Sequence, residues 1–268
     1  MFDKVTTSLR ILAAAGVEEA ASGHPGMPLG MADVGTVLYK KFLKVSNENP
    51  SWINRDRFIL SPGHGSMLLY SLLHLNGFDL TKEDLKNFRQ FDSKTPGHPE
   101  FDLSTGIDMT TGPLGQGFST GVGFAVAERY LSELLGEDII DHFTYGIVSD
   151  GDLMEGISFE AAELAAVWKL GKLIYVFDNN NISIDGRVSK VSITDQKKKF
   201  EAIGWHVLEI DAHSEDEIST ALEDAKLIID KPSIIMAKSI IGKFGLSFIR
   251  FSGACTKSQS VFPFSFSA

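Results

Sequence analysis

Two stretches carry the clearest structural signal in this chain: HFTYGIVSDGD at residues 142–152 and LIYVFDNNN at residues 173–181. Each begins with an apolar run rich in aromatic and β-branched residues, which is typical of a strand, and ends in polar turn formers. The run at 173–177 is apolar throughout, as in strands buried on both faces of a parallel sheet. A helical segment is expected between the two, at about 155–168. Strand, helix and strand in this order predict a parallel βαβ unit.

Outward from this unit, the alternation of strand and helix continues along the chain. Further strands are expected at residues 57–60, 205–210 and 233–237. Helices are expected at 1–20, 31–43, 66–75, 115–135 and 214–229, with a helix-opening cap at 81–84. Residues 92–114 contain many turn formers and predict a long loop, which in a compact domain is usually functional or disordered. The sequence therefore predicts an α/β fold, a mostly parallel sheet with helices on both faces.

The polar turns after the two central strands form a candidate binding site, because ligands of parallel sheets gather at the carboxyl ends of strands. Asp150 and Asn180 lie about one βαβ unit apart, so the fold could bring their side-chain oxygens together. A carboxylate, an amide oxygen and a backbone carbonyl form an oxygen-only set suited to Mg²⁺ or Ca²⁺. Gly151 would let a diphosphate approach the backbone at the start of the next helix. On these turns alone, the alternative that Asp150 and Asn180 are only turn and cap residues stays equally open.

Three of the seven histidines lie in turns rich in glycine and proline: His24, His64 and His98. A single turn histidine more often has no function, but three in such rigid settings predict one shared polar pocket. Neutral imidazoles suit hydroxyl recognition and proton transfer near pH 7. No histidine or cysteine spacing indicates zinc. The remaining histidines are expected in the core, at strand ends or on the surface: His74, His142, His206 and His213.

Composition and charge narrow the class of protein. The net charge of -10 argues against a nucleic-acid or anionic-membrane surface, although a local helix N-terminus can still hold a phosphate. No apolar run approaches a membrane span, no signal peptide is seen, and the single cysteine, Cys255, fits a reducing compartment. We therefore expect a cytoplasmic protein. No acidic residue follows Asp230, and six phenylalanines occur from Phe244 onward, so residues 244–268 are expected to be an irregular or disordered tail after a domain at 1–243.

Several segments together resemble one known family. Asp-Gly followed about thirty residues later by Asn-Asn is similar to the signature of thiamin-diphosphate enzymes, with Ser149 in place of the usual preceding glycine. The other segments resemble transketolase blocks, and the resemblance covers residues 1 to about 243. These blocks are residues 22–28, 60–66, 88–90, 93–100, 110–117, 154–158 and 182–186. The family's fold is the thiamin-diphosphate-binding fold, in agreement with the α/β prediction.

The resemblance implies a cofactor, thiamin diphosphate, bound through Mg²⁺ or Ca²⁺. Asp150, Asn180 and the carbonyl of Ile182 would be the metal ligands. Gly151 would contact the diphosphate, and His64 would lie beside it.

The resemblance also implies how the rest of the cofactor and the sugar are held. Gly112 and Leu114 would meet the aminopyrimidine through their backbone, and Ile184 would pack on the thiazolium. His24 and His98 would bind hydroxyls of the ketose donor. By the same resemblance, Glu155 would join a carboxylate network across a dimer interface.

The implied function is transfer of a two-carbon ketol unit between sugar phosphates, with a homodimer or a pyrimidine-binding C-terminal subunit as partner. Transketolases need such a second domain, and nothing after residue 243 could form it. Two explanations stay open: a separately encoded N-terminal subunit, or a frameshift near Lys243 that leaves an inactive fragment. A 1-deoxyxylulose-5-phosphate synthase or a 2-oxoacid dehydrogenase subunit is the enzyme alternative, which the 112–117 block and the His98 loop disfavour.

Overall fold

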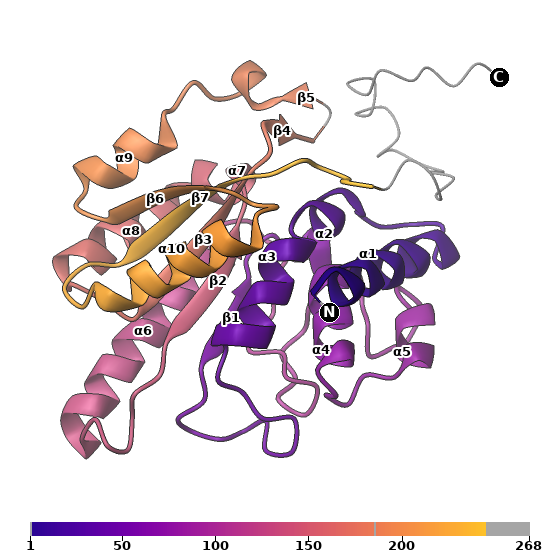
Figure 1. The fold of residues 1–268 in the computed structure, drawn as a ribbon, viewed down its shortest axis with the longest axis horizontal. Helices are drawn as coiled ribbons and strands as arrows, with labels where there is room; N and C mark the ends of the chain where they lie inside the picture. Colours follow the sequence, from indigo (N-terminus) through magenta and orange to yellow (C-terminus); the bar gives the residue numbers. More distant parts are fainter. Residues whose placement is uncertain (1, 185, 245–268) are drawn as a thin grey trace.

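Five parallel strands form one sheet at the centre of the computed structural model, which describes residues 2–184 and 186–244 (Figure 1). Their order across the sheet is β1-β2-β3-β7-β6, and every neighbouring pair is parallel. The strands are β1 (Arg57–Leu60), β2 (Thr144–Val148), β3 (Leu173–Asn179), β6 (His206–Asp211) and β7 (Ser233–Lys238). The predicted fold class is thus confirmed, while most of the expected tail, residues 245–268, lies outside the described residues.

The two strands that began the prediction are direct neighbours. Thr144 pairs with Leu173 and Val148 with Phe177, so the last residues of β2 and β3 are nearly level. The polar turns that follow them therefore leave the sheet at the same edge, as expected for adjacent parallel strands.

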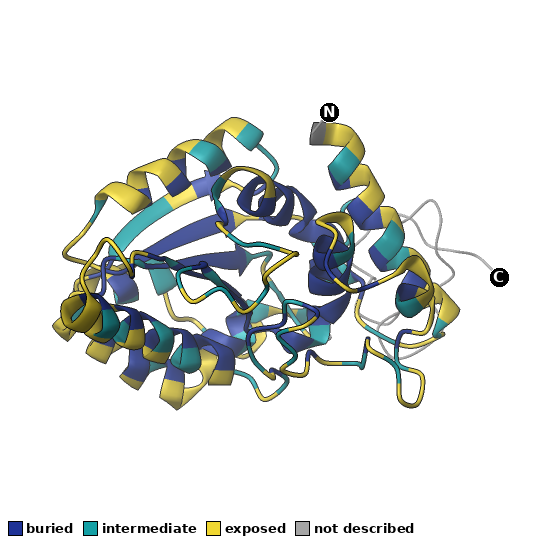
Figure 2. Cartoon of the chain, turned by 90° about the horizontal axis from the view of Figure 1, so that it is seen from below, coloured by how far each residue is buried: buried dark blue, intermediate teal, exposed yellow. Residues whose placement is uncertain are grey.

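Helices cover both faces of the sheet because the strand side chains alternate between two apolar cores. Ile174 and Val176 of β3 belong to the first core, and Tyr175 and Phe177 belong to the second. The first core is covered by α1 (Phe2–Glu19), α3 (Ala32–Val37), α4 (Ser66–Leu75) and α10 (Glu215–Leu227). The second is covered by α6 (Gln116–Leu135), α8 (Gly156–Val167) and α9 (Gln196–Ala202). Figure 2 shows the buried strands between helices whose outer sides are exposed.

The remaining elements are short and lie in connections. They are α2 (Gly26–Gly30), a π-helix (Leu38–Phe42), a 3₁₀ turn (Gly63–Gly65), α5 (Lys82–Lys86), α7 (Asp150–Met154), β4 (Ile182–Ser183), β5 (Gly186–Arg187) and a 3₁₀ turn (Val188–Lys190). Thr81 caps α5 through a capping box with Asp84, as the sequence predicts. In the described part of the chain, no helix has the length and apolar character needed to cross a membrane.

The structure differs from the sequence expectations in three places. The helix expected at 31–43 changes from α3 into a π-helix after Val37. A separate short helix, α7, precedes the helix expected at 155–168, because Ser149 and Asp152 form a capping box directly after β2. The α9 helix and the β4–β5 hairpin were not expected, since neither has a long apolar period.

Candidate functional site

The turn after β2 places a carboxylate at the first position of α7. Asp150 is only 7% exposed, and Asp178, near the end of the neighbouring strand β3, is 1% exposed. Burial and the charge of Asp178 raise the pKa of Asp150 to about 7. Burial likewise raises the pKa of Asp178 to about 6. Two acidic groups therefore lie close together at a buried edge of the sheet, where their negative charge is costly.

The turn after β3 is arranged around the Asp178 carboxylate. The Asn180 side-chain amide donates to Asp178 Oδ2 at 2.9 Å, and the Ser239 hydroxyl, just after β7, donates to Asp178 Oδ1. The backbone amide of Ile182 donates to Asn180 Oδ1 at 2.8 Å, which leaves the second lone pair of that oxygen. Ile182 begins β4, which packs against α7. The proposed ligands are thus carried by contacting elements.

These residues fit a divalent cation held by few protein ligands. Among the residues that the structure describes, no group of three or more histidine, cysteine or acidic side chains could hold a metal. Nevertheless, no cationic side chain lowers the pKa of the Asp150 carboxylate. A cation at this edge would offset the charges of both acids, and diphosphate oxygens and water would complete its coordination.

The three turn histidines come together next to this edge. The His24 and His64 rings have centroids 5.1 Å apart, at an interplanar angle of 64°. Burial and the neighbouring His24 and His98 lower the pKa of His64 to about 4. The pKa of His24 is also lowered, by burial and by the charge of Arg89, and so is the pKa of His98, for the same reasons. All three imidazoles are therefore neutral near pH 7 and can donate or accept hydrogen bonds.

Arg89 joins the turns that carry two of these histidines. Its guanidinium donates to the Ser22 hydroxyl at 2.7 Å, two residues before His24. A Cβ on Gly97, the residue before His98, would lie 3.0 Å from Arg89 Nε. Arg89 lies in one of the blocks that resemble transketolases, and no local sequence pattern indicates these partners.

The 112–115 loop lies between the histidines and the acidic turn. A Cβ on Gly112 would meet the His98 ring at 3.4 Å, and a Cβ on Gly151 would meet Leu114 at 2.8 Å. Gly115 has a φ of +80°, a left-handed conformation that favours glycine. Gly151 and Leu114, which the family resemblance assigns to the diphosphate and to the aminopyrimidine, therefore lie against each other.

The sequence of this chain is similar to those of known proteins. The family model "Transketolase, thiamine diphosphate binding domain" matches residues 2–253. The chain belongs to this transketolase family. It is 53% identical over 243 residues to transketolase 1 of Escherichia coli, covering 89% of this chain and 37% of that protein, and 52% identical to the transketolase of Bacillus subtilis.

Solved transketolase structures show the same fold. The crystal structure of the Campylobacter jejuni enzyme superposes with a TM-score of 0.89 at 50% identity, covering 92% of this chain and 38% of that one. The transketolase of Leishmania mexicana gives a TM-score of 0.88 at 44% identity. The chain thus spans a little over a third of the length of these relatives.

Two predicted site residues of this transketolase-family domain are exposed. Glu155 is exposed and stands at the N-cap of α8, where Gly115 approaches its Cβ. Ile184 is 89% exposed, with a φ of +52°. No described side chain covers Ile184, which leaves its apolar surface free for a ligand or another chain.

One residue at the centre of the candidate site, Asp152, was not expected from the sequence. Asp152 is fully buried, and its carboxylate accepts hydrogen bonds from Ser61, Gly115 and Ser149. Its signal was the Ser-x-x-Asp spacing from Ser149, which is that of a capping box. The spacing indicates the local bond but not the two partners from remote turns.

One discounted histidine also proves to be well connected. His213 Nδ1 lies 2.8 Å from Asp33 Oδ2, and its Nε2 accepts from the backbone amide of Ile240 at 3.1 Å. Asp33 in turn pairs with Arg10 at 2.5 Å. The expectation of a structural role agrees with this geometry, which holds the segment after β7 in place.

Proposed function

We propose that this domain binds the diphosphate of thiamine diphosphate through a divalent cation, Mg²⁺ or Ca²⁺, at the carboxyl edge of the sheet. Asp150, Asn180 and the carbonyl of Ile182 are the proposed metal ligands. The observation that carries the proposal is the Asp150 carboxylate, buried beside Asp178 without a cationic side chain to offset it. Family membership supports the choice of cofactor.

The neighbouring loops would orient the rest of the cofactor. Gly151 offers a close backbone approach to the diphosphate, and Gly112 and Leu114 present backbone groups to the aminopyrimidine. Ile184, exposed in this chain, is the proposed apolar contact of the thiazolium. When bound, thiamine diphosphate supplies the carbanion chemistry, and the protein supplies orientation and exclusion of water.

We further propose that the complete enzyme transfers a two-carbon ketol unit between sugar phosphates. The neutral rings of His24 and His98 would hold hydroxyls of the ketose donor, and His64 would lie beside the diphosphate, where it can exchange a proton. The relatives are transketolases more than twice as long as this chain, so a pyrimidine-binding domain or subunit is the proposed partner. Glu155, exposed at the N-cap of α8, is proposed to join a carboxylate network across a homodimer interface.

The domain is proposed to comprise residues 1–243, in a cytoplasmic protein. All the site residues and both apolar cores lie within these bounds. A single cysteine in 268 residues supports a reducing compartment.

Titration calorimetry with thiamine diphosphate, with and without Mg²⁺, tests the metal-mediated mode of binding. We expect Mg²⁺-dependent binding that Asp150→Asn weakens by at least about 100-fold, since even outer-shell partners of metal sites contribute 10- to 100-fold. Asp138→Asn, an exposed acid before β2, is the matched control and should bind like the parent chain. Binding that is independent of Mg²⁺, or unchanged in Asp150→Asn, would contradict the proposal.

An activity assay with an added pyrimidine-binding partner chain tests the reaction. Ketol transfer between sugar phosphates is the expected result. Cofactor binding without turnover would indicate an inactive fragment, and activity on pyruvate alone would favour the synthase or dehydrogenase alternative.

A further inference from the structure

Asp152 is not among the residues proposed to contact the metal or the cofactor. Its side chain is fully buried, two residues after the proposed metal ligand Asp150. Within the described residues, no lysine, arginine or histidine forms an ion pair with it. A buried carboxylate without a counter-charge is stable only if hydrogen bonds satisfy it.

Four donors satisfy this carboxylate, and they come from three separate turns. Oδ1 accepts from the Ser61 hydroxyl at 2.6 Å and from the Gly115 backbone amide at 2.9 Å. Oδ2 accepts from the backbone amide and the hydroxyl of Ser149, both at 2.9 Å. Ser61 Oγ also accepts from the Phe118 amide at 3.0 Å, at the start of α6.

Each of these turns carries a different part of the proposed cofactor site. Ser149 precedes the metal turn, Ser61 precedes the turn of His64, and Gly115 ends the loop that contains Leu114. Sequence separations of 91 and 37 residues divide Asp152 from Ser61 and Gly115. One side chain therefore sets the positions of three loops relative to one another.

We propose that Asp152 is a positioning residue that holds the 112–115 loop in register with the metal turn. This inference rests on the proposed binding of thiamine diphosphate. Leu114 contacts the Cα of Gly151 closely enough that an added Cβ would lie 2.8 Å away, so a shift of the loop changes the space between the diphosphate and aminopyrimidine positions. None of the proposed metal ligands lies within that loop.

The identity of the side chain follows from its donors. An aspartate offers two acceptor oxygens, whereas asparagine replaces one with an NH₂ group that can only donate. Serine hydroxyls can rotate to accept from that group, but the backbone amides of Gly115 and Ser149 cannot. Ser149 is only three residues away, in the capping box of α7, so the asparagine oxygen is expected to keep the Ser149 amide. Asp152→Asn therefore leaves the Gly115 amide facing another donor, at the same side-chain volume.

Two ligands separate positioning from a general structural effect. Inorganic pyrophosphate with Mg²⁺ uses the metal turn and the His64 turn but not the 112–115 loop, whereas thiamine diphosphate with Mg²⁺ also uses that loop. In Asp152→Asn we expect about tenfold weaker binding of thiamine diphosphate and less than about twofold weaker binding of pyrophosphate. Ser61→Ala, which keeps the Gly115 bond, should give the same trend with a smaller effect and serves as the milder variant if Asp152→Asn folds poorly. Equal losses for both ligands would overturn the inference.

Hydrogen exchange of the ligand-free full chain provides a readout that does not depend on the cofactor. Faster exchange of the Gly115 amide is expected in Asp152→Asn, with protection in β3 unchanged. If the Gly115 amide stays as protected as in the parent chain, Asp152 does not hold the loop. If exchange changes as expected but the parent chain binds no thiamine diphosphate, the proposed function fails and the structural bond stands.

Discussion

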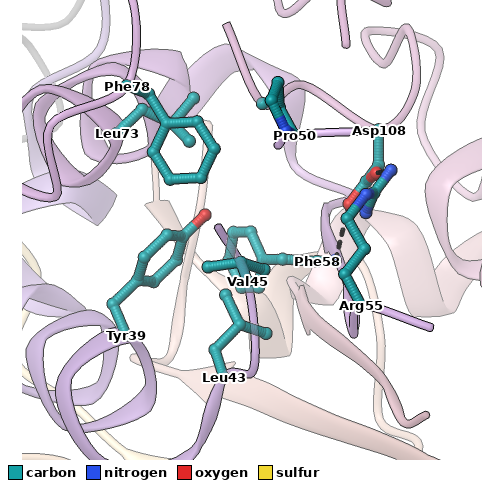
Figure 3. Close-up of a pocket in the computed structure, with 10 residues that line it drawn as sticks. Tyr39, Leu43, Val45, Pro50, Arg55, Phe58, Leu73, Phe78 and Asp108 are labelled. Atoms are coloured by element: carbon teal, nitrogen blue, oxygen red, sulfur yellow. Dashed lines mark hydrogen bonds and ion pairs between the residues drawn. The ribbon is translucent and has the colours of Figure 1, made fainter. Parts of the chain in front are cut away.

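The two edges of the central sheet differ in whether their buried acidic side chains have a cationic partner. At the amino edge, before β1, Arg55 Nη2 lies 2.6 Å from Asp108 Oδ1, and the Phe58 amide donates to the other oxygen of Asp108 at 2.9 Å (Figure 3). Before β3, Lys172 lies 2.8 Å from both Glu128 and Asp141. Asp108, Glu128 and Asp141 are therefore each matched by a cation within the chain.

At the carboxyl edge, no described cationic side chain offsets Asp150, whereas His213 partly offsets Asp178 and lowers its pKa. The pocket at the amino edge, lined by Arg55 and Asp108 among others, has a volume of about 10 Å³, room for at most about one water molecule. The difference teaches that a buried acid matched by an ion pair or by hydrogen bonds serves the structure, as Asp108 and Asp152 do. The Asp150 carboxylate, which has no such cation, is the one that awaits a ligand.

Breaking the amino-edge pair should have the largest effect on stability. Arg55→Met leaves Asp108, whose pKa burial already raises, without its counter-charge. We expect a loss of about 3–5 kcal/mol in the free energy of unfolding, as for other buried pairs broken on one side. Urea denaturation followed by circular dichroism measures it.

The double variant Arg55→Met/Asp108→Leu is the control for this prediction. It should recover most of the loss, because no unpaired charge remains. A loss below about 1 kcal/mol in the single variant, typical of exposed pairs, would show that the amino edge is not defined by this ion pair.

The next largest effect concerns pH and the carboxyl edge. The pKa of His64 falls from 6.5 to about 4 in the folded chain. As the pH decreases, this imidazole is therefore protonated in the unfolded chain at a higher pH than in the folded chain. Stability from this group is complete above pH 6.5 and is lost as the pH falls through 4, by up to about 3 kcal/mol. His64→Gln should make the unfolding free energy depend less on pH between pH 7 and 4.

His142 provides the counterpart at the amino edge. It is 3% exposed, and burial with the nearby Arg57 lowers its pKa to about 3. His142→Gln should therefore also reduce the change in unfolding free energy between pH 7 and 4. If neither substitution changes the dependence of the unfolding free energy on pH, burial does not disfavour the protonated imidazole at either edge, and the structural explanation is wrong.

An exposed pair away from both edges should show the smallest effect. Lys86 and Glu83 lie 3.0 Å apart with side chains 55% and 72% exposed. Lys86→Ala should change the unfolding free energy by less than about 0.5 kcal/mol, measured by the same urea denaturation. A larger change would mean that burial does not separate the strong pairs from the weak ones in this chain.

Much of this architecture was predictable from local patterns. The strand at residues 57–60 and the capping box at Thr81 agree with the structure, because apolar period and cap chemistry act over a few residues. The turns of Asp150 and Asn180 were also predictable, since each directly follows an apolar strand. The α7 helix was missed because a five-residue helix has no period of its own.

The sequence by itself determined the five strands of the sheet and most of the longer helices, and which polar residues stand at the strand ends. Only the tertiary structure decided that His24 meets His64, that Arg89 joins the turns before His24 and His98, and that Asp152 binds Ser61 and Gly115. The physical reason is distance along the chain: a strand or a cap is selected by its neighbours, whereas the partner of a buried charge is supplied by whichever remote turn the packed sheet brings beside it.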